Sequence, residues 1–453
     1  MPEHVSSASF LRVIWSAVGG DKALAPRVAF AGAGDLPSAF PVSDLAAGAV
    51  AAAALAVAEL AGAAAASVDR RLASFWFRFS LRPEGWSPAP PWDPIAGDYA
   101  AADGWIRLHT NAPRHRAAAL AVLGAAGDKN AVTRAVAGWR ADDLEAAIVD
   151  DGGCAAAMRS LAAWAEHSQG RAVAEEPLVW RSDGNGAARA TASADPSRPL
   201  AGVKVLDLTR VLAGPVATRF LAGYGADVLR IDPPDWNEPA ITPEVTLGKR
   251  CARLDLRAPA DRETLLGLLA EADLFIHGYR PGALEGLGLG EEVRRRVRPG
   301  LVEVCLDAYG WTGPWAGRRG FDSLLQMSSG IADAGMRRVG AETPTPLPVQ
   351  ALDHATGYIL AASAVRGLTK RLQTGVGSSW RASLARTAAL LASEAAPEAA
   401  EPFADPSVAD LADGVEATAW GPARRLKPPV AIAGAPMRWD RPAADLGSSP
   451  ARW

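Results

Sequence analysis

The chain has 453 residues, of which 49% are hydrophobic and 21% are charged, and its formal net charge is −3. This length can hold two or three domains with cores of their own, and the composition is ordinary for a globular protein. A net charge this close to zero gives no electrostatic reason to expect nucleic-acid binding. An anionic ligand would therefore have to be met by local basic groups.

Targeting, membrane and metal signals are weak. Residues 1–4 show no basic segment followed by an apolar run, so we expect no signal peptide. The apolar stretch from Leu45 to Ala66 is mostly alanine and contains Glu59, which favours a buried helix over a membrane span. The cysteines are far apart and lack a metal-binding spacing: Cys154, Cys251 and Cys305. We expect neutral thiols, no metal site and a cytoplasmic protein.

Two units are predicted, residues 1–190 and 198–453. A stretch from Glu175 to Pro199, rich in Ser, Asp, Gly and Ala, is expected to link them. The first unit is predicted to contain a long helix at 44–65, a turn and strand at 103–109, and short helices at 116–125, 132–138 and 142–149. These elements indicate a small α+β arrangement.

The second unit alternates predicted strands with predicted helices. Strands are expected at 203–208, 228–231, 274–277 and 301–306, with a further short strand ending at Leu254, and helices are expected at 215–224 and 261–271. Such alternation predicts βαβ units and a parallel sheet. The predicted fold class is therefore α/β, with an open, Rossmann-like parallel sheet in the large domain and a smaller α+β domain.

A short repeat connects the two units. Residues 41–48 and 351–357 both contain Asp-x-Ala-x-Gly, at Asp44 and Asp353, and an alanine-rich helix is predicted after each. The repeat suggests a partial duplication. Each aspartate has two interpretations, as the cap of its helix or as a carboxylate nucleophile. The spacing alone favours the cap.

The first turn between strand and helix, Thr209 to Pro215, is the natural ligand site of an open α/β sheet. A helix N-terminus and Arg210 would both favour an anion there. Asp232 could imitate the ribose-binding acid of an NAD site, but the turn lacks the glycines of a dinucleotide fingerprint.

Basic residues recur near the ends of the predicted strands: Arg210, Arg230, Lys249, Arg250 and Arg280. Several cations at one edge of a parallel sheet would suit the phosphates of coenzyme A, which carries several negative charges.

These segments resemble the family III CoA-transferases, the group that includes formyl-CoA and carnitine CoA-transferases and 2-methylacyl-CoA racemases. The stretch from Pro199 to Pro215 is similar to the opening of that family. Four later segments follow in the order and spacing of the family: 225–231, 248–250, 279–284 and 309–314. Together they make the resemblance specific.

The resemblance implies a reaction and a set of site residues. In this family an aspartate attacks an acyl-CoA thioester, and CoA then passes through an aspartyl thioester to a carboxylic acid. Asp353 falls where that aspartate is expected, with Asp44 as the alternative. CoA contacts are implied at Arg210, Val211, Ala213, Arg230, Lys249, Arg250, Tyr279 and Arg280. CoA is then a substrate and not a permanent cofactor, the partners are an acyl-CoA and an acid, and a homodimer is expected.

The order of the segments is unusual for the resemblance. Residues 41–190 are similar to the later part of the family, residues 199–390 to its opening, and residues 428–447 to its end. The racemase branch has a histidine where Phe321 stands, which argues against racemisation. An acyl-CoA racemase or epimerase, a non-catalytic CoA-binding homologue and an NAD-dependent enzyme remain as alternatives.

Overall fold

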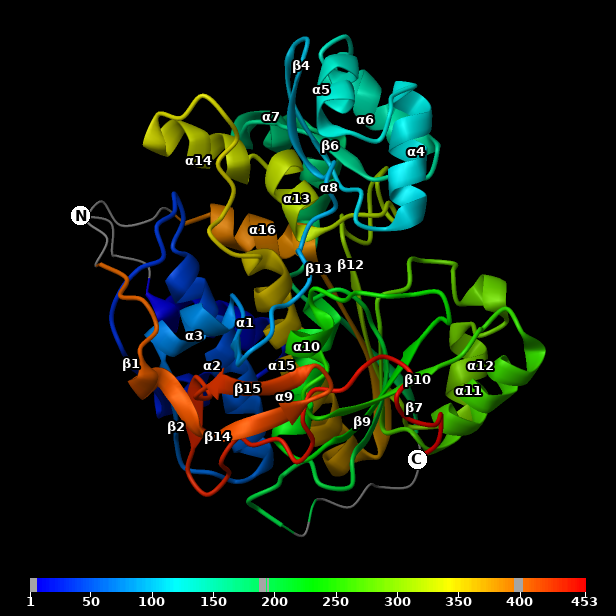
Figure 1. The fold of residues 1–453 in the computed structure, drawn as a ribbon. Coiled ribbons are helices and arrows are strands. Elements are labelled where there is room, and N and C mark those ends of the chain that lie inside the picture. The colour runs from blue at the N-terminus through cyan, green and yellow to red at the C-terminus, as the bar shows by residue number, and fades with distance from the viewer. Residues whose placement is uncertain (1–5, 187–192, 194, 395–401) are drawn as a thin grey trace.

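In the computed structural model, residues 6–186, 193, 195–394 and 402–453 are described (Figure 1). A seven-stranded sheet forms the centre of the molecule. Its strand order is β10-β9-β8-β11-β12-β13-β7, and every neighbouring pair is parallel except β13 with β7. The strands are β7 (Trp180–Gly186), β8 (Lys204–Leu208), β9 (Asp227–Asp232), β10 (Lys249–Arg253), β11 (Leu274–His277), β12 (Val302–Asp307) and β13 (Val376–Ser383).

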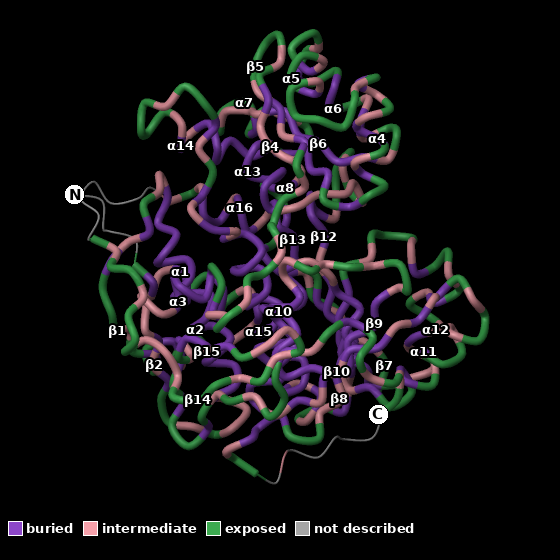
Figure 2. The backbone as a smooth tube through the Cα atoms, viewed as in Figure 1, coloured by how far each residue is buried: buried purple, intermediate pink, exposed green. Residues whose placement is uncertain are grey.

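Helices cover both faces of this sheet. Because successive side chains of a strand point to opposite faces, Val205 joins one core and Leu206 the other. The first core also holds α2 (Val42–Leu60), α9 (Ala213–Gly223) and α15 (Ala351–Thr374), whereas the second holds α11 (Pro259–Glu271). The buried segments, purple in Figure 2, run through the middle of the molecule, as expected for a sheet buried on both sides.

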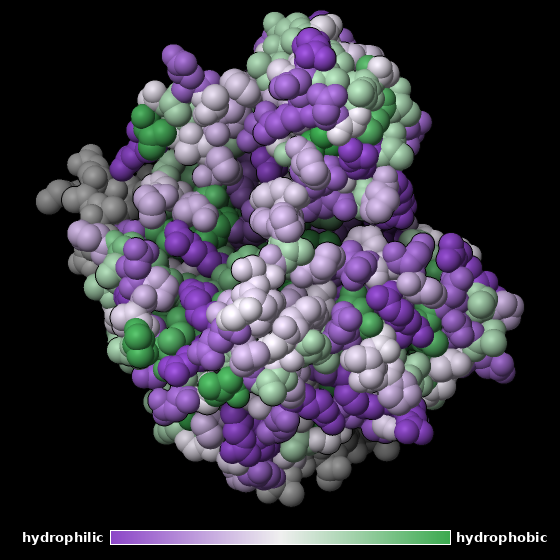
Figure 3. All heavy atoms as spheres, viewed as in Figure 1, coloured by the Kyte–Doolittle hydropathy of each residue, from purple (hydrophilic) through white to green (hydrophobic). Residues whose placement is uncertain are grey.

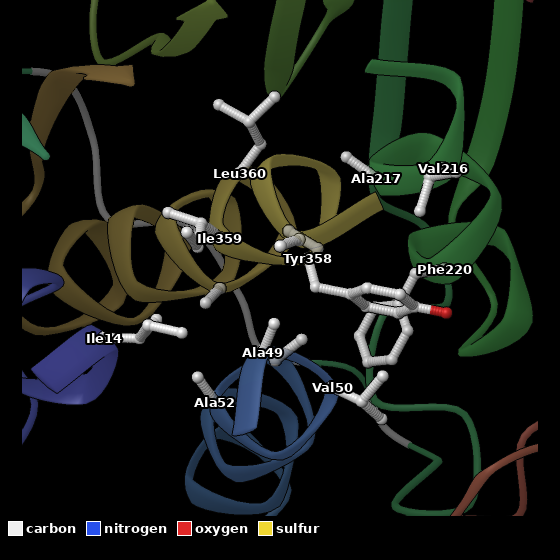
Figure 4. Packing of buried hydrophobic residues seen from close by; sticks show 14 of the residues in the cluster. Ile14, Ala49, Val50, Ala52, Val216, Ala217, Phe220, Tyr358, Ile359 and Leu360 are labelled. Carbon is white, nitrogen blue, oxygen red and sulfur yellow. The ribbon is translucent and has the colours of Figure 1, made fainter. Parts of the chain in front are cut away.

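Helix α15 lies between α2 and α9 (Figure 4). Glycines allow this close packing. A Cβ atom on Gly357 would come within 2.5 Å of the Ala213 carbonyl oxygen at the start of α9, and one on Gly48 would come within 2.5 Å of the Phe10 Cβ on α1 (Ser7–Ala17). The glycine of each Asp-x-Ala-x-Gly repeat is therefore the point where its helix meets a neighbour.

The small domain is a lobe above this body in Figure 1. The antiparallel strands β4 (Gly97–Ala101), β5 (Gly104–Leu108) and β6 (Ala155–Ala157) share a core with the helices α4 (Pro113–Leu123), α5 (Lys129–Val136) and α6 (Ala141–Asp150). The α+β arrangement predicted for this region is what the structure shows.

Segments from the two chain ends pair with each other in two small sheets. One is β1 (Val28–Ala31), β2 (Ala66–Asp69) and β16 (Val430–Ile432), and the other is β3 (Leu81–Pro83), β14 (Leu411–Thr418) and β15 (Gly421–Leu426). The remaining helices are α3 (Arg70–Trp76), α7 (Leu161–Glu166), α8 (Ser168–Glu175), α10 (Thr242–Val245), α12 (Glu291–Val297), α13 (Asp322–Ser328), α14 (Ile331–Val339) and α16 (Leu384–Ala392), with short 3₁₀ turns at Lys22–Arg27, Glu285–Leu287 and Val408–Asp410.

The predicted α/β class with a mostly parallel sheet is confirmed, and two local predictions are wrong. The helix expected at 44–65 ends at Leu60, because the chain turns at Gly62 (φ +66°) and enters β2. The expected linker is not a linker over Trp180–Gly186, because β7 adds an edge strand to the large sheet there. The later residues 187–192 and 194 lie outside the described residues, and the division at 190–198 stays a prediction.

Within the described ranges, one helix, α2, is long and apolar enough to cross a membrane by length and composition. Inside this molecule, 94% of its most apolar window is buried, as predicted for the Leu45 to Ala66 stretch. The three cysteines are buried free thiols, and burial raises the pKa of both Cys154 and Cys251 to about 11. These thiols are therefore neutral at physiological pH, as expected from the sequence.

Candidate active site

The turn after β8 is already paired with a carboxylate of the protein itself, the side chain of Glu238. Val211 has a positive φ of 65°, which costs energy for a β-branched residue. Its backbone N–H donates to Glu238 Oε1 at 2.6 Å. The carboxylate of Glu238 therefore takes the position near the start of α9 that was predicted for a ligand anion.

Two of the predicted CoA contacts are buried in ion pairs beneath this turn. Arg230 is 0% exposed and donates to Asp232 at 2.8 and 2.9 Å and to Glu238 at 2.7 Å. Lys249 is 1% exposed and donates to Asp207 at 3.1 Å. Burial lowers the pKa of Lys249 to about 8, against the opposing effect of Asp207. Both cations are neutralised by the protein and do not reach the surface in this structure.

Arg250 lies at the other end of the sheet. Its guanidinium donates to Asp227, the first residue of β9, at 2.7 and 3.1 Å, and also to the Arg452 carbonyl near the C-terminus. Ligands of open parallel sheets bind at the carboxyl ends of the strands, where Arg210 and Arg280 lie. The structure therefore does not bring Arg250 together with those two residues.

Three predicted residues do meet at the carboxyl edge. The Arg210 guanidinium lies over the Tyr279 ring at 5.3 Å and over the Trp236 ring at 5.1 Å. Arg280 follows Tyr279 directly and donates to the Gly317 carbonyl at 3.3 Å. Ala213 is buried as the first residue of α9 and contributes backbone at the same edge. Arg210 and Arg280 have no carboxylate partner among the described residues.

Asp353 is a buried carboxylate in the first turn of α15. It is 7% exposed, and no described residue donates a hydrogen bond to its side chain. Its own backbone N–H donates to Asp322 Oδ2 at 2.9 Å. Asp353 lies one helical turn before Gly357, so it faces the side of α15 that contacts the start of α9.

The two carboxyl groups influence each other strongly. Burial and the Asp322 charge hold the pKa of Asp353 well above its ordinary value. Burial raises the pKa of Asp322 to about 6, although hydrogen bonds from the Asp353 amide and the Gln326 side chain lower it. Two close carboxylates in a buried site resist ionising together. In the unliganded protein this pair therefore retains a proton that a lone exposed aspartate would lose.

The helix-cap interpretation is wrong for both aspartates. The N-cap residues of α2 and α15 are Pro41 and Gln350, and neither aspartate caps its helix with its side chain. Pro41 (φ −77°, ψ 65°) and Gln350 (φ −75°, ψ 65°) have nearly the same backbone angles. The sequence repeat is thus a structural repeat at the helix entry.

Asp44 differs from Asp353 in its partners. It accepts a hydrogen bond from Ser7 Oγ at 2.7 Å, and Arg70 donates to its two oxygens at 3.0 and 3.1 Å. Arg70 also pairs with Asp35. The carboxylate of Asp44 is consequently fully engaged in structural contacts.

Two imidazole rings pack against Phe321, the residue before Asp322. His109 stacks on Phe321 with a ring-centroid distance of 3.7 Å, and His115 packs at a steep angle at 5.9 Å. Burial lowers the pKa of His109 to about 3 and that of His115 to about 4. Both imidazoles are therefore neutral and weakly basic at physiological pH.

A cavity of about 580 Å³ lies between the small domain and the sheet edge, where Figure 3 shows the surface hollowed below the upper lobe. Arg280, Arg318 and Arg319 line it from the large domain, and Glu145, Arg159 and His167 line it from the other side. Sequence reasoning missed Arg319 and also Arg114 at the start of α4. The adjacent pair Arg318 and Arg319 was a signal for the first, but Arg114 had no comparable signal.

No described group of three His, Cys, Asp or Glu side chains could hold a metal ion.

A known family model matches most of the large domain. The model of CoA-transferase family III matches residues 200–424. An acetyl-coenzyme A transferase of Hypoxylon pulicicidum is 34% identical over 44% of this chain and 34% of its own length. Succinyl-CoA:glutarate CoA-transferase of Mus musculus is 33% identical over 42% of this chain and 46% of its own length.

Solved structures also match. A crystal structure of Rv3272 from M. tuberculosis shares 30% identity over 44% of this chain and 58% of that one, with a TM-score of 0.41. A CAIB/BAIF family protein from Brucella suis shares 29% identity over 44% and 56%, with a TM-score of 0.40. The chain spans about a third to a half of the length of the two curated relatives named above. The matched residues 200–424, which include Arg210, Tyr279, Arg280 and Asp353, are therefore similar to CoA-transferase family III.

Proposed function

We propose that this protein transfers CoA from an acyl-CoA to a carboxylic acid, with Asp353 as the nucleophile. One observation supports this most directly: within the region that matches the family III model, Asp353 is a buried carboxyl group to which no described residue donates a hydrogen bond. A structural aspartate this deeply buried normally has partners, as Asp44 does. An unpartnered, pKa-shifted acid beside a ligand edge is the usual mark of a reacting group.

The proposed reaction has two halves. A carboxylate oxygen of Asp353 attacks the thioester carbon, the C–S bond breaks, and a mixed anhydride and the CoA thiolate form. The thiolate then attacks the Asp353 carbonyl carbon, which releases the donor acid and leaves an aspartyl-CoA thioester. The acceptor carboxylate then attacks the aspartyl thioester and expels the CoA thiolate, which forms a second mixed anhydride. The thiolate attacks the acceptor carbonyl carbon of this anhydride, so that acceptor acyl-CoA leaves and the Asp353 carboxylate is regenerated.

Attack requires the ionised form of Asp353. Its raised pKa means that the unliganded protein stores the proton on the Asp322–Asp353 pair, and this proton must leave before the first attack. The first turn of the 24-residue helix α15 favours the carboxylate, because the N-terminal amides carry partial positive charge. The same amides can stabilise the oxyanion that develops during each attack.

Chemical trapping tests this assignment. The protein is incubated with acyl-CoA and hydroxylamine, which cleaves an anhydride or thioester to an aspartyl hydroxamate, and the modified peptide is identified by mass spectrometry. We expect the hydroxamate at Asp353, its loss in Asp353→Asn, and its persistence in Asp44→Asn. A hydroxamate at Asp44, or none with any of a broad set of acyl-CoA donors, would contradict the assignment.

An acyl-CoA racemase or epimerase is the second candidate, because two histidines lie beside Phe321. Phe321 replaces the histidine of that branch, yet His109 and His115 both contact its ring. Their lowered pKa values make them poor bases for an α-proton. Exchange of the α-hydrogen of a chiral acyl-CoA in deuterated water, lost in His109→Ala, would favour racemisation over transfer.

A non-catalytic CoA-binding protein is the third candidate. It would bind CoA without exchanging it between any acyl-CoA and acid, and Asp353→Asn would leave its affinity unchanged. We also propose a homodimer in the cytoplasm, which sedimentation and localisation measurements can test.

A further inference from the structure

Four arginines have no carboxylate partner among the described residues, and two of them, Arg280 and Arg319, line the cleft between the small domain and the sheet edge. They come from four separate segments: Arg114 at the start of α4, Arg210 after β8, Arg280 after β11 and Arg319 before α13. Most other guanidiniums beside this cleft are paired. Arg159 and Arg318 donate to Glu145 at 2.7 and 2.6 Å, for example.

Short contacts connect these segments. Arg280 donates to the carbonyl of Gly317, two residues before Arg319. Arg114 Nε donates to His115 Nε2 at 3.3 Å, and the His115 ring contacts Phe321, two residues after Arg319. Arg280 and Arg319 both line the same cavity of about 580 Å³. The small domain thus presents Arg114 to the arginines of the large domain.

The guanidiniums are close enough to repel one another. Burial lowers the pKa of Arg114, and the charges of Arg319, Arg210 and Arg280 lower it further. Burial also lowers the pKa of Arg280, again with a contribution from Arg319. Like charges without counterions destabilise the unliganded arrangement, and an anion bound among them would remove that penalty.

We propose that Arg114 and Arg319 complete, with Arg210 and Arg280, a binding site for the phosphate groups of the acyl-CoA substrate, so that the small domain and the sheet edge hold the same ligand. The inference rests on the proposed function for the identity of the ligand. It adds two residues, one of them from outside the matched region 200–424, that neither the family match nor the sequence patterns assign.

The number of charges favours phosphate over a carboxylate. A terminal phosphate carries roughly −1.5 to −2 charge at neutral pH, and CoA adds a diphosphate to it, whereas a simple acceptor acid offers a single carboxylate to the site. Four planar guanidiniums match a ligand with several oxyanions, because each can donate two parallel hydrogen bonds to phosphate oxygens.

Contacts near Arg210 favour a phosphate position outside the turn that follows β8. Glu238 already accepts the Val211 amide, so a phosphate bound deep at the start of α9 would meet a carboxylate. Beside Arg210, the buried indole N–H of Trp236 has no acceptor among the described residues. A ligand oxyanion above Arg210 can use both the guanidinium and this N–H.

Calorimetric titration of the full chain with CoA and with 3′-dephospho-CoA tests the site. Arg114→Gln and Arg319→Gln are each expected to raise the Kd for CoA about ten-fold or more, the loss typical of a hydrogen bond to a charged group. The matched control is Arg134→Gln, an exposed arginine on α5 of the same small domain. It should bind CoA like the wild type, and melting temperatures show that each variant is folded.

Comparing CoA with 3′-dephospho-CoA shows which phosphate group each arginine contacts. If an arginine contacts the 3′-phosphate, its variant and the wild type bind dephospho-CoA alike; if it contacts the diphosphate, the loss persists. The site is overturned if both variants bind CoA as tightly as the wild type, or change only the KM for the acceptor acid. Binding that fits the site without any acyl exchange would contradict the proposed function alone.

Discussion

Two helices of this chain begin with the same motif and the same backbone turn, yet their aspartates have different surroundings. Asp44 on α2 is held by Ser7 and Arg70, whereas Asp353 on α15 accepts no hydrogen bond from a described residue, and the charge of Asp322 opposes its ionisation. The repeat fixes the backbone conformation at the start of each helix, whereas the neighbouring charged residues decide whether its aspartate is ionised and paired. One copy serves as a structural ion pair, and the other is suited to react.

Asparagine at each aspartate should separate the two roles most strongly. We expect Asp353→Asn to lower kcat for CoA exchange by at least about a thousand-fold, because it removes the attacking carboxylate that both half-reactions need. Asp44→Asn should keep measurable exchange per folded molecule. Steady-state rates, normalised to the folded fraction by circular dichroism, check both. Equal losses in the two variants would remove the distinction.

Stability should show the reverse pattern. Arg70→Ala leaves Asp44 and Asp35 without their cation in a poorly exposed site, so we expect the free energy of unfolding to fall by about 3 kcal/mol. Asp353→Asn removes a carboxyl group whose ionisation is opposed by burial and by Asp322, and it should not destabilise the protein at neutral pH. Urea unfolding of the wild type, Arg70→Ala and Asp353→Asn at pH 7 measures these free energies of unfolding. Destabilisation by Asp353→Asn comparable to that by Arg70→Ala would show that Asp353 is structural as well.

The repeat glycines offer a finer comparison. Gly357→Ala would place a Cβ against the Ala213 carbonyl, and Gly48→Ala one against Phe10, so each should cost about 1–3 kcal/mol of stability. Gly357 lies one helical turn after Asp353 and contacts the start of α9. Gly357→Ala should therefore also reduce kcat, whereas Gly48→Ala should act on the unfolding free energy alone. Parallel activity losses in both variants would deny α15 a special role.

The alternation of strands and helices was enough to predict the parallel sheet. The resemblance to the family named Arg210, Tyr279 and Arg280, and the structure has these three residues at one edge of that sheet. The fates of Arg230 and Lys249 could not be predicted in the same way. Their charges are cancelled by Asp207, Asp232 and Glu238, and two of those ion pairs join residues that are not neighbours in sequence. Periodicity identifies the strand that carries a cation but not the carboxylate that its side chain reaches.

The edge strand and the cleft arise from longer-range contacts. The residues of β7 are predicted to be a linker because they are polar and include two glycines. The strand is mostly exposed and forms by pairing with β13. Arg114 lies almost a hundred residues before Arg210, so its approach to the sheet edge depends on how the small domain packs. Neither contact leaves a signal in the local pattern of residues.

The smallest expected effect is a shift in pH dependence, and it probes the interaction that distinguishes Asp353 from Asp44. Exchange needs ionised Asp353, so kcat/KM should rise with pH, with a midpoint above the ordinary value for aspartate. Asp322→Asn removes the like charge and should therefore lower the pKa of Asp353 and move the rising limb to lower pH. The amide oxygen of the new asparagine can still accept the Asp353 N–H, although Gln326 loses its charged acceptor.

The raised pKa of Asp322 should also make the free energy of unfolding depend on pH. Because the folded pKa of Asp322 is raised to about 6, the native state holds more protons than the unfolded state between about pH 4 and 6, and stability falls as pH rises through that window. Asp322→Asn should flatten the fall, as seen by urea unfolding at several pH values. An unchanged pH–rate midpoint in this variant, with its fold intact, would mean that burial alone raises the pKa of Asp353 and that the neighbouring carboxylate is not what sets the two helices apart.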